Sequence, residues 1–301
     1  MSRSTTEPLV DRHFLEKLER LTLHWQKSFN GLVGGHNASR FAGAGQEFLE
    51  HRNFHHGDDL RAVNWRAYMR FDKLFLKMFQ IEPRVPVRLL LDASASMTAA
   101  TAAGEITKFE YARKIAAAFV YVALVRLDSI LLQPFSARLL EPFLASGGRH
   151  RFQPAENYLR ELRADAKTDF FDTARQYLST YPQRGLTIVI SDFLDDSDCL
   201  HPLQYLADFG HELLLIQLWS EEDRQPAEDG EMELIDAETG EHARMAVDER
   251  AREAYVRAFD RYAEELKKLA LRNGGRYAGL STRINIEEAI FGPLTLAQGL
   301  G

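Results

Sequence analysis

Apolar residues occur with two different periods over residues 82–301. Short runs in which nearly every position is apolar, such as 87–92 and 186–191, are typical of strands that are buried on both faces of a sheet. Longer segments between these runs, among them 107–126 and 248–272, have apolar residues at the spacing of an amphipathic helix. Strands that alternate with helices predict an α/β fold: a Rossmann-like, open, mostly parallel sheet with helices on both faces.

The remaining elements of this region follow from the same two periods. We expect two neighbouring strands or a hairpin over 129–145, helices near 154–164, 169–180 and 200–209, strands at 212–219 and 276–281, and a short helix near 285–292. Thr239 and Gly240 separate two short extended runs, which predicts an inserted acidic hairpin near 221–247. All of these elements are expected to belong to one domain over 82–301.

The chain before this domain follows a different pattern. Residues 11–29 have apolar positions at helical spacing, whereas residues 31–80 are rich in Gly, His, Arg and Asp. Short apolar stretches in the second segment predict strands near 47–54 and 73–81 within irregular structure. We therefore expect an N-terminal module over 1–81 that consists of a helix followed by short strands and irregular segments.

Composition and charge narrow the class of protein. The net charge of −7 argues against a general nucleic-acid binder, because such a protein needs a basic face. The one cysteine, Cys199, suits a reducing compartment, and we expect it to be a small apolar side chain inside a helix. The first residues lack an apolar signal-peptide region, and the longest apolar run in a helix, 115–125, is shorter than the roughly 20 residues that span a bilayer. We expect a cytoplasmic protein without a membrane span.

A carboxylate and two hydroxyls follow the first buried strand at alternate positions. They belong to Asp92, Ser94 and Ser96, and the alternation lets the three side chains point the same way from an extended turn. Asp192 follows a second buried strand, and Thr168 lies on a loop before a helix. Because ligands of open α/β sheets bind beyond the carboxyl ends of the strands, we expect the five side chains to face one crevice.

The five side chains offer only oxygen ligands, which suits Mg²⁺ and leaves Mn²⁺ or Ca²⁺ as alternatives. Zinc is disfavoured, because no Cys or His belongs to the set. With so few carboxylates, the metal would have an open coordination position for an acidic side chain of a partner. Asp192 would coordinate the metal directly or through water. The alternative is that Asp92 and Ser94 only cap the following helix.

Enzyme classes fit this sequence less well. A haloacid-dehalogenase-type phosphatase would need a second carboxylate where Ser94 stands, and a serine hydrolase would need glycines around Ser94 or Ser96. The motif of an ATP-binding P-loop does not occur in the sequence. A metal-dependent phosphate-ester hydrolase that uses Asp92 remains the rival hypothesis from the enzyme class.

With these residues, the chain resembles a von Willebrand factor A-like domain. The sequence D-A-S-A-S that begins at Asp92 matches the first motif of the metal-ion-dependent adhesion site (MIDAS) of that superfamily. Thr168 matches the threonine of its second loop and Asp192 the aspartate of its third, although Lys167 stands where a glycine is common. The resemblance implies a Mg²⁺ site whose ligand offers a carboxylate.

The segment before the domain makes the resemblance more specific: it is similar to the bacterial family named domain of unknown function 58. The matching positions are Gly45, Glu47, Phe48, Arg52, Gly57, Asp58, Asp59, Arg61, Trp65 and Arg66. Phe54 replaces the usual Tyr, and Asn64 replaces the usual Asp. The resemblance extends over residues 30–290.

Members of this family are commonly associated with MoxR-type AAA+ ATPases, and the resemblance implies an adaptor or chaperone-like role. Our hypothesis from the sequence is therefore a non-enzymatic, metal-dependent protein-binding protein. Its partner would be a MoxR-type AAA+ ATPase or a client of that ATPase, and nucleic acid is not expected as a partner. A metal-free interaction scaffold is the alternative outside the enzyme class.

Two further groups of polar residues have a structural interpretation. The histidines between residues 51 and 56 resemble a second metal site together with Asp58 and Asp59, but the family pattern keeps only the acidic pair. We expect this pair to accept hydrogen bonds from backbone or from nearby arginines. The stretch 221–241 carries ten Asp or Glu residues against one Arg, and we expect a solvated insertion there or a docking surface for a basic partner.

Overall fold

The computed structural model describes residues 8–19, 47–55, 63–80, 87–98, 106–125, 129–194, 198–225, 230–235 and 242–296. The chain divides into two compact units: a small unit over Lys27–Val85, and a large unit formed by Met1–Gln26 together with Pro86–Gly301. The boundary lies near the expected one at residue 82. Residues 12–19, which the sequence analysis grouped with the N-terminal module, form a helix of the large unit instead.

The small unit contains a two-stranded sheet and a short helix. Strands β1 (Glu47–Asn53) and β2 (Phe75–Gln80) pair antiparallel, in agreement with the two strands expected there, and α2 (Trp65–Phe71) lies between them in the sequence. Asn64 caps α2, because its side-chain oxygen accepts a 3.3 Å hydrogen bond from the backbone N–H of Ala67. The carboxamide of Asn64 can therefore act as a helix cap.

The large unit is built on a six-stranded sheet with the strand order β10-β7-β6-β3-β4-β5. The strands are β3 (Val87–Asp92), β4 (Ile130–Phe135), β5 (Phe143–Ala145), β6 (Leu186–Ser191), β7 (Glu212–Trp219) and β10 (Arg276–Ser281). All neighbours are parallel except the β4–β5 pair, which is antiparallel. This mostly parallel sheet confirms the fold class that the alternating pattern predicts.

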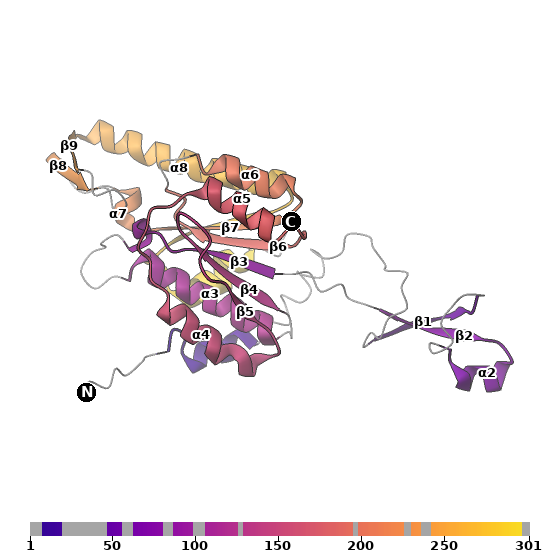
Figure 1. Ribbon diagram of the computed structural model, residues 1–301. Coiled ribbons are helices and arrows are strands. Elements are labelled where there is room, and N and C mark those ends of the chain that lie inside the picture. The colour runs from indigo at the N-terminus through magenta and orange to yellow at the C-terminus, as the bar shows by residue number, and fades with distance from the viewer. Residues whose placement is uncertain are drawn as a thin grey trace. The chain divides into compact units, whose positions relative to one another are not determined.

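The helices of the large unit cover both faces of the sheet (Figure 1). They are α3 (Lys108–Val125), α4 (Phe152–Glu161), α5 (Phe170–Thr180), α6 (Leu200–Asp208), α8 (Glu249–Arg272) and the short α9 (Ile286–Ala289), with short helical turns at Ala95–Thr98, Arg149–Arg151 and Ile290–Leu294. In Figure 1, α5, α6 and α8 lie on one side of the sheet, and α3 and α4 lie on the other. The sheet is the middle layer of three.

Burial of the strands explains why this layering is stable. Every residue of β6 is buried, and so are five of the six residues of β3. Successive side chains of a strand point to opposite faces, so Leu90 and Val189 join the core beneath α5, α6 and α8. At roughly 25 cal/mol per Å² of buried apolar surface, this double-sided burial is the main source of stability.

The acidic insertion follows β7. A four-residue helix, α7 (Glu221–Arg224), is followed by strands β8 (Gly230–Ile235) and β9 (His242–Val247), which pair antiparallel. The expected inserted hairpin is therefore present.

The order of the strands creates a switch point in the sheet. From β3 the chain first adds β4 on one side, and it later returns to add β6, β7 and β10 on the other side. The carboxyl ends of β3 and β6 are thus neighbours at the place where the direction of winding changes. Open α/β sheets bind ligands at such a switch point, and the strand-end residues Asp92 and Asp192 lie there.

Candidate functional site

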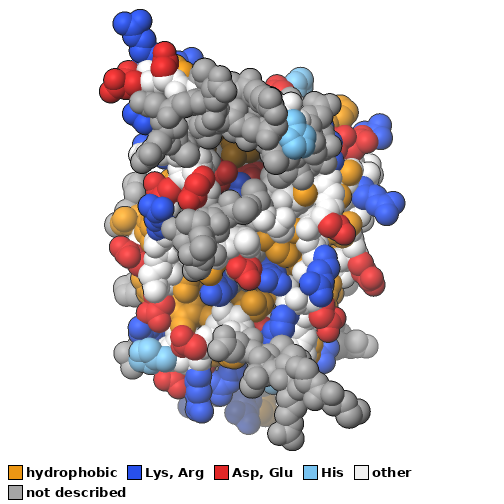
Figure 2. Space-filling view, turned by 90° about the vertical axis from the view of Figure 1, so that its left-hand side faces the viewer, with side chains coloured by type: hydrophobic (Ala, Val, Ile, Leu, Met, Phe, Trp, Pro, Cys, Tyr) orange, Lys and Arg blue, Asp and Glu red, His pale blue; other side chains and the backbone are white. Residues whose placement is uncertain are grey.

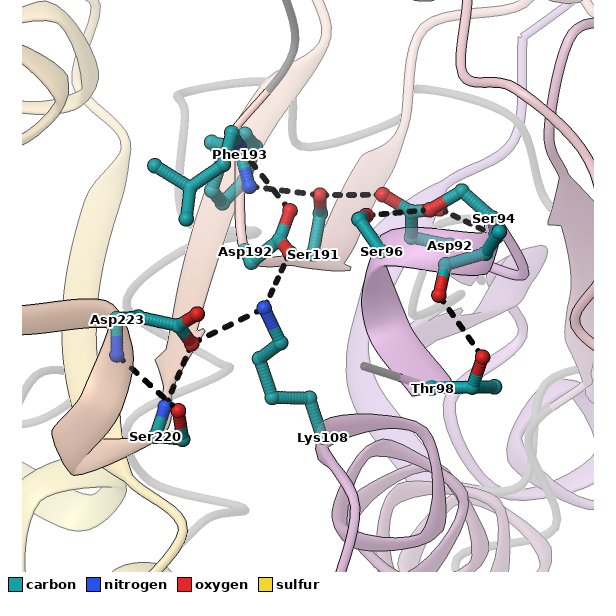
Figure 3. A network of polar contacts seen from close by, with 12 residues as sticks. Asp92, Ser94, Ser96, Thr98, Lys108, Ser191, Asp192, Phe193, Ser220 and Asp223 are labelled. Atoms are coloured by element: carbon teal, nitrogen blue, oxygen red, sulfur yellow. Dashed lines mark hydrogen bonds and ion pairs between the residues drawn. The ribbon is translucent and has the colours of Figure 1, made fainter. Parts of the chain in front are cut away.

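Asp92 is the last residue of β3 and is only 1% exposed. Its Oδ1 accepts a 2.9 Å hydrogen bond from the backbone N–H of Ser94, and its Oδ2 accepts a 2.5 Å hydrogen bond from the hydroxyl of Ser191 (Figure 3). The sequence analysis did not single out Ser191, although it directly precedes Asp192 at the end of a buried strand. Because both oxygens of the carboxylate accept hydrogen bonds, its orientation is fixed.

The two serines of the D-x-S-x-S segment lie side by side. The hydroxyl oxygens of Ser94 and Ser96 are 2.9 Å apart, and Ser94 is buried whereas Ser96 is half-buried. Thr98, one turn further on, hydrogen-bonds the carbonyl of Ala95 instead and lies on the exposed side of the turn (Figure 3). The alternation therefore places the two hydroxyls together at the end of β3, as expected.

Thr168 is brought to the same edge of the sheet by its loop. The backbone N–H of Ala95 donates a 2.8 Å hydrogen bond to Ala166, and the N–H of Asp165 donates one of 3.2 Å to Ala93. These bonds tie the loop before α5 to the turn after β3. Thr168 is buried in this loop.

Asp192 follows β6 and is 2% exposed. Its Oδ1 accepts a 3.0 Å hydrogen bond from the backbone N–H of Leu194. Between them, Phe193 has a φ of 56°, in the left-handed region that few non-glycine residues adopt. Its backbone N–H donates to the hydroxyl of Ser191, and its carbonyl accepts a 2.8 Å hydrogen bond from Tyr262 of α8. This strained turn directs the Asp192 carboxylate towards α3.

A buried lysine, which the sequence analysis did not identify, completes the site. The ammonium of Lys108, the first residue of α3, lies 2.7 Å from Oδ2 of Asp192 and 3.0 Å from Oδ2 of Asp223 (Figure 3). Its side chain is 3% exposed. Asp223 also accepts a hydrogen bond from Ser220 in the capping box of α7. Asp223 is thus an exception to the solvated insertion expected for the acidic stretch, because it pairs with a buried lysine.

The charges of the site influence one another. Burial and the neighbouring charge of Asp192 raise the pKa of Asp92 to about 7. Burial would lower the pKa of Lys108, but its contacts with Asp192 and Asp223 outweigh this effect and raise that pKa. Lys108 therefore stays protonated and balances Asp192, while Asp92 changes its charge close to neutral pH.

The residues fit a hard cation in part. The hydroxyls of Ser94 and Ser96 hydrogen-bond each other at 2.9 Å. This separation is also close to the roughly 3.0 Å between neighbouring oxygens of an octahedron with metal–oxygen bonds of about 2.1 Å. Asp92 supplies a carboxylate beside them. Asp192 is different, because one of its oxygens already pairs with Lys108. Within the described residues, no group of three or more His, Cys, Asp or Glu side chains is arranged to hold a metal, so any cation here would depend on hydroxyls.

Other candidates from the sequence lie elsewhere or outside the described residues. Asp58 and Asp59 fall outside them, so their expected hydrogen bonds stay a prediction. Cys199 is buried at the start of α6, with its sulfur 3.6 Å from the carbonyl of Phe193. The exposed Asp198, directly before Cys199, accepts a hydrogen bond from the N–H of Leu200 and so acts as a cap.

The fold and the site together define a Rossmann-like α/β protein with a buried oxygen cluster at the switch point of its sheet. Residues 50–265 match the family model described as "Protein of unknown function DUF58", and the chain belongs to this family. An uncharacterized protein of Mycobacterium tuberculosis is 24% identical over 244 residues, which cover 80% of this chain and 76% of the relative. A protein of Mycobacterium bovis matches with the same identity and coverage.

Solved structures of other proteins are similar in outline. The conserved hypothetical protein BatB from Bacteroides thetaiotaomicron is 15% identical, with 71% of this chain and 98% of that chain covered and a TM-score of 0.43. The VWA domain of SpRpn10 is 12% identical, with 72% and 99% covered and a TM-score of 0.38. The fold class rests on the strand order described above. None of the helices in the described part of the chain is long and apolar enough to cross a bilayer.

Proposed function

We propose that this protein is a non-enzymatic binding protein with a metal-dependent site of the MIDAS type. Asp92, Ser94, Ser96, Thr168 and Asp192 would hold the cation, with Mg²⁺ preferred and Mn²⁺ or Ca²⁺ as alternatives. The observation that carries the proposal is the pair of hydroxyls 2.9 Å apart beside a buried carboxylate at the switch point of the sheet. When bound, the cation supplies an open coordination position for a carboxylate.

The partner in this proposal is a protein that offers a Glu or Asp side chain to the cation. On the side of the molecule shown in Figure 2, acidic and basic side chains are interspersed over the described surface. Such a surface favours recognition through one local contact over attraction by a broad patch of one sign. The family resemblance points to a MoxR-type AAA+ ATPase or its client, and the proposal includes a cytoplasmic location.

A second candidate function, a metal-free interaction scaffold, is supported by one observation. Lys108 already provides a cation for Asp192, so the charge of this strand-end carboxylate is balanced without a metal. In this case Asp92 and the two serines would stabilise the turn after β3, and partner binding would not depend on a divalent cation.

A calorimetric titration with Mg²⁺ and with Mn²⁺ distinguishes the two candidates. The wild type is compared with Ser96→Ala, which removes a half-buried hydroxyl without emptying a core position, and with Asp92→Asn. Thr98→Ala is the matched control, because this hydroxyl lies in the same turn but hydrogen-bonds Ala95. A cation at a hundredfold excess over its dissociation constant should also raise the free energy of unfolding by about 2.7 kcal/mol.

The metal-dependent proposal expects binding by the wild type and by Thr98→Ala, and at least tenfold weaker binding by the other two variants. Equal response of all four proteins would show that the cation binds elsewhere, and no response would leave the scaffold function. The capture of partner proteins by the purified protein is then compared in the presence of Mg²⁺ and in the presence of a chelator. Hydrolysis of a phosphate monoester in Mg²⁺, abolished by Asp92→Asn, would contradict the non-enzymatic part of the proposal.

A further inference from the structure

Lys108 occupies a place where a positive charge is normally unfavourable. It is the first residue of α3, and the positive end of a helix dipole disfavours a cation there. Its side chain is also removed from water, which costs several kcal/mol for an unpaired ammonium. The two carboxylates of Asp192 and Asp223 offset both costs. The arrangement therefore depends on the two ion pairs being held together.

The two partners of Lys108 come from different parts of the fold. Asp192 follows β6 at the switch point, whereas Asp223 belongs to α7, beyond the end of β7 (Figure 3). The charge of Asp192 raises the pKa of Asp92, and Lys108 contacts Asp192 but not Asp92 in the polar network. Asp192 is thus shared between Lys108 and the proposed metal site that contains Asp92.

We infer that Lys108 is a built-in competitor of the divalent cation, and that Asp223 sets the strength of this competition. The inference rests on the proposed metal function, and it names how that site is regulated. A cation beside Asp92 needs the negative charge of Asp192, which Lys108 neutralises. Asp223 forms a second ion pair with Lys108, so the ammonium neutralises Asp192 less completely. Part of the negative charge of Asp192 then stays available to the divalent cation.

The inference predicts effects of opposite sign for two neighbouring substitutions. Lys108→Met keeps an unbranched chain of similar length but removes the charge, so it should tighten Mn²⁺ binding by about tenfold, equivalent to about 1.4 kcal/mol. Asp223→Asn leaves Lys108 with Asp192 as its one charged partner among the described residues, so it should weaken Mn²⁺ binding by a similar factor. The asparagine can still accept the hydrogen bond from Ser220 and preserve the cap of α7.

Each substitution has a control that changes charge by the same amount. Lys17→Met removes a lysine that pairs with Glu287 on another part of the large unit. Asp198→Asn removes an exposed carboxylate that follows β6 but caps the start of α6. Both controls should leave the dissociation constant within about twofold of the wild type, because charges that remain in contact with solvent are screened.

The measurement is a calorimetric titration of Mn²⁺ into each purified protein. Each protein is first treated with chelator to remove bound metal. Tighter binding by Lys108→Met together with weaker binding by Asp223→Asn supports the inference. If the wild type binds but neither variant differs from its control, Lys108 does not compete and the proposed function stands. If only Lys108→Met binds, the inference holds and the wild type acts as a metal-free scaffold.

Two other outcomes are decisive. If neither the wild type nor Lys108→Met binds Mn²⁺ at millimolar concentrations, the inference and the metal-dependent function both fail. If Lys108→Met does not fold, Asp223→Asn decides alone: unchanged or tighter binding than Asp198→Asn overturns the inference. Circular dichroism of each variant establishes folding before the titration.

Discussion

The hydroxyl of Ser191 donates a 2.5 Å hydrogen bond to Asp92, and this bond joins the ends of β6 and β3. The same hydroxyl oxygen accepts the backbone N–H of Phe193. One buried side chain therefore orients the carboxylate of the candidate site and also stabilises the turn that directs Asp192.

Ser191→Ala should lower the free energy of unfolding by about 1–3 kcal/mol, because it leaves a buried carboxylate oxygen and a buried N–H without these partners. Urea denaturation at neutral pH measures the change. Ser179→Ala is the control, since this hydroxyl bonds the carbonyl of Arg175 on an exposed helix surface. Equal effects of the two substitutions would show that the Ser191 bonds contribute no more than an ordinary surface bond.

Asp92→Asn should change the pH dependence of stability in chelator. The pKa of Asp92 is about 7 in the folded protein, above the value of about 3.9 for an unfolded chain. Between these values the folded state holds a proton that the unfolded state has lost, so this group's contribution to stability falls as pH rises from 4 to 7. Asparagine lacks this titration.

The free energy of unfolding of Asp92→Asn, relative to the wild type, should therefore increase by about 2 kcal/mol from pH 5 to pH 8. Denaturation series at matched pH values give this difference directly. Parallel profiles for the two proteins would mean that the Asp92 carboxylate is already ionised at pH 5.

Phe193 combines a buried ring with a left-handed backbone conformation. Replacement by glycine should therefore leave the protein more stable than replacement by alanine, the reverse of the usual order. Its ring stacks on Phe170 with centroids 5.7 Å apart, and either substitution should cost several kcal/mol. Phe193→Gly should nevertheless be more stable than Phe193→Ala by about 1 kcal/mol, because glycine adopts a φ of 56° without strain.

Phe135 provides the matched control for this comparison. It is also fully buried, but it lies in β4 with a strand backbone, where glycine should be the less stable of the two replacements by about 0.5–1 kcal/mol. Thermal or urea unfolding of the four variants gives both orders. The same order at both positions would contradict a strained turn at Phe193.

His211 should make the protein less stable in mild acid. It is buried, and burial together with the charge of Arg88 lowers its pKa to about 4. Its Nδ1 lies 3.2 Å from the hydroxyl of Thr187. Below the ordinary histidine pKa of about 6.5, the unfolded state gains a proton that the folded state refuses, so stability falls as pH decreases towards 4.

Relative to His211→Gln, the wild type should therefore lose about 2 kcal/mol of stability between pH 7 and pH 5. The difference between variants is the useful quantity, because Asp92 contributes with the opposite sign in the same range. His201→Gln, which replaces an exposed histidine, should follow the wild-type profile. A His211→Gln profile that also follows the wild type would show that His211 takes up a proton freely when folded.

Local sequence patterns were sufficient for the elements of the sheet and for the strand-end residues. The apolar runs that end at Asp92 and Asp192 coincide with β3 and β6, because a strand buried on both faces leaves a continuous signal. Thr168 was expected near them from its place on a loop before a helix and from the resemblance, and the backbone bonds of Asp165 and Ala166 tie that loop to the turn after β3.

Long-range pairs could not be predicted in this way. Lys108 at the start of a helix has the appearance of a surface residue, and its partner Asp192 is 84 positions away in the sequence. Asp223 was hidden among ten acidic residues of a stretch that looks solvated. The helix over residues 12–19 was likewise grouped with its neighbours in sequence, although Lys17 pairs with Glu287 of the large unit.

The antiparallel strand β5 has a consequence for assembly. It is three residues long and pairs with β4 over Ile130–Leu132, so it presents only a short row of backbone groups to solvent. In the connection between β4 and β5, the chain folds back on β4: the N–H of Leu140 donates to the carbonyl of Pro134, and the side chain of Gln133 donates to the carbonyl of Leu140. A short edge strand of this kind discourages pairing with a strand from another chain. On this flank, we expect the sheet to resist both fibril growth and the capture of extended peptides.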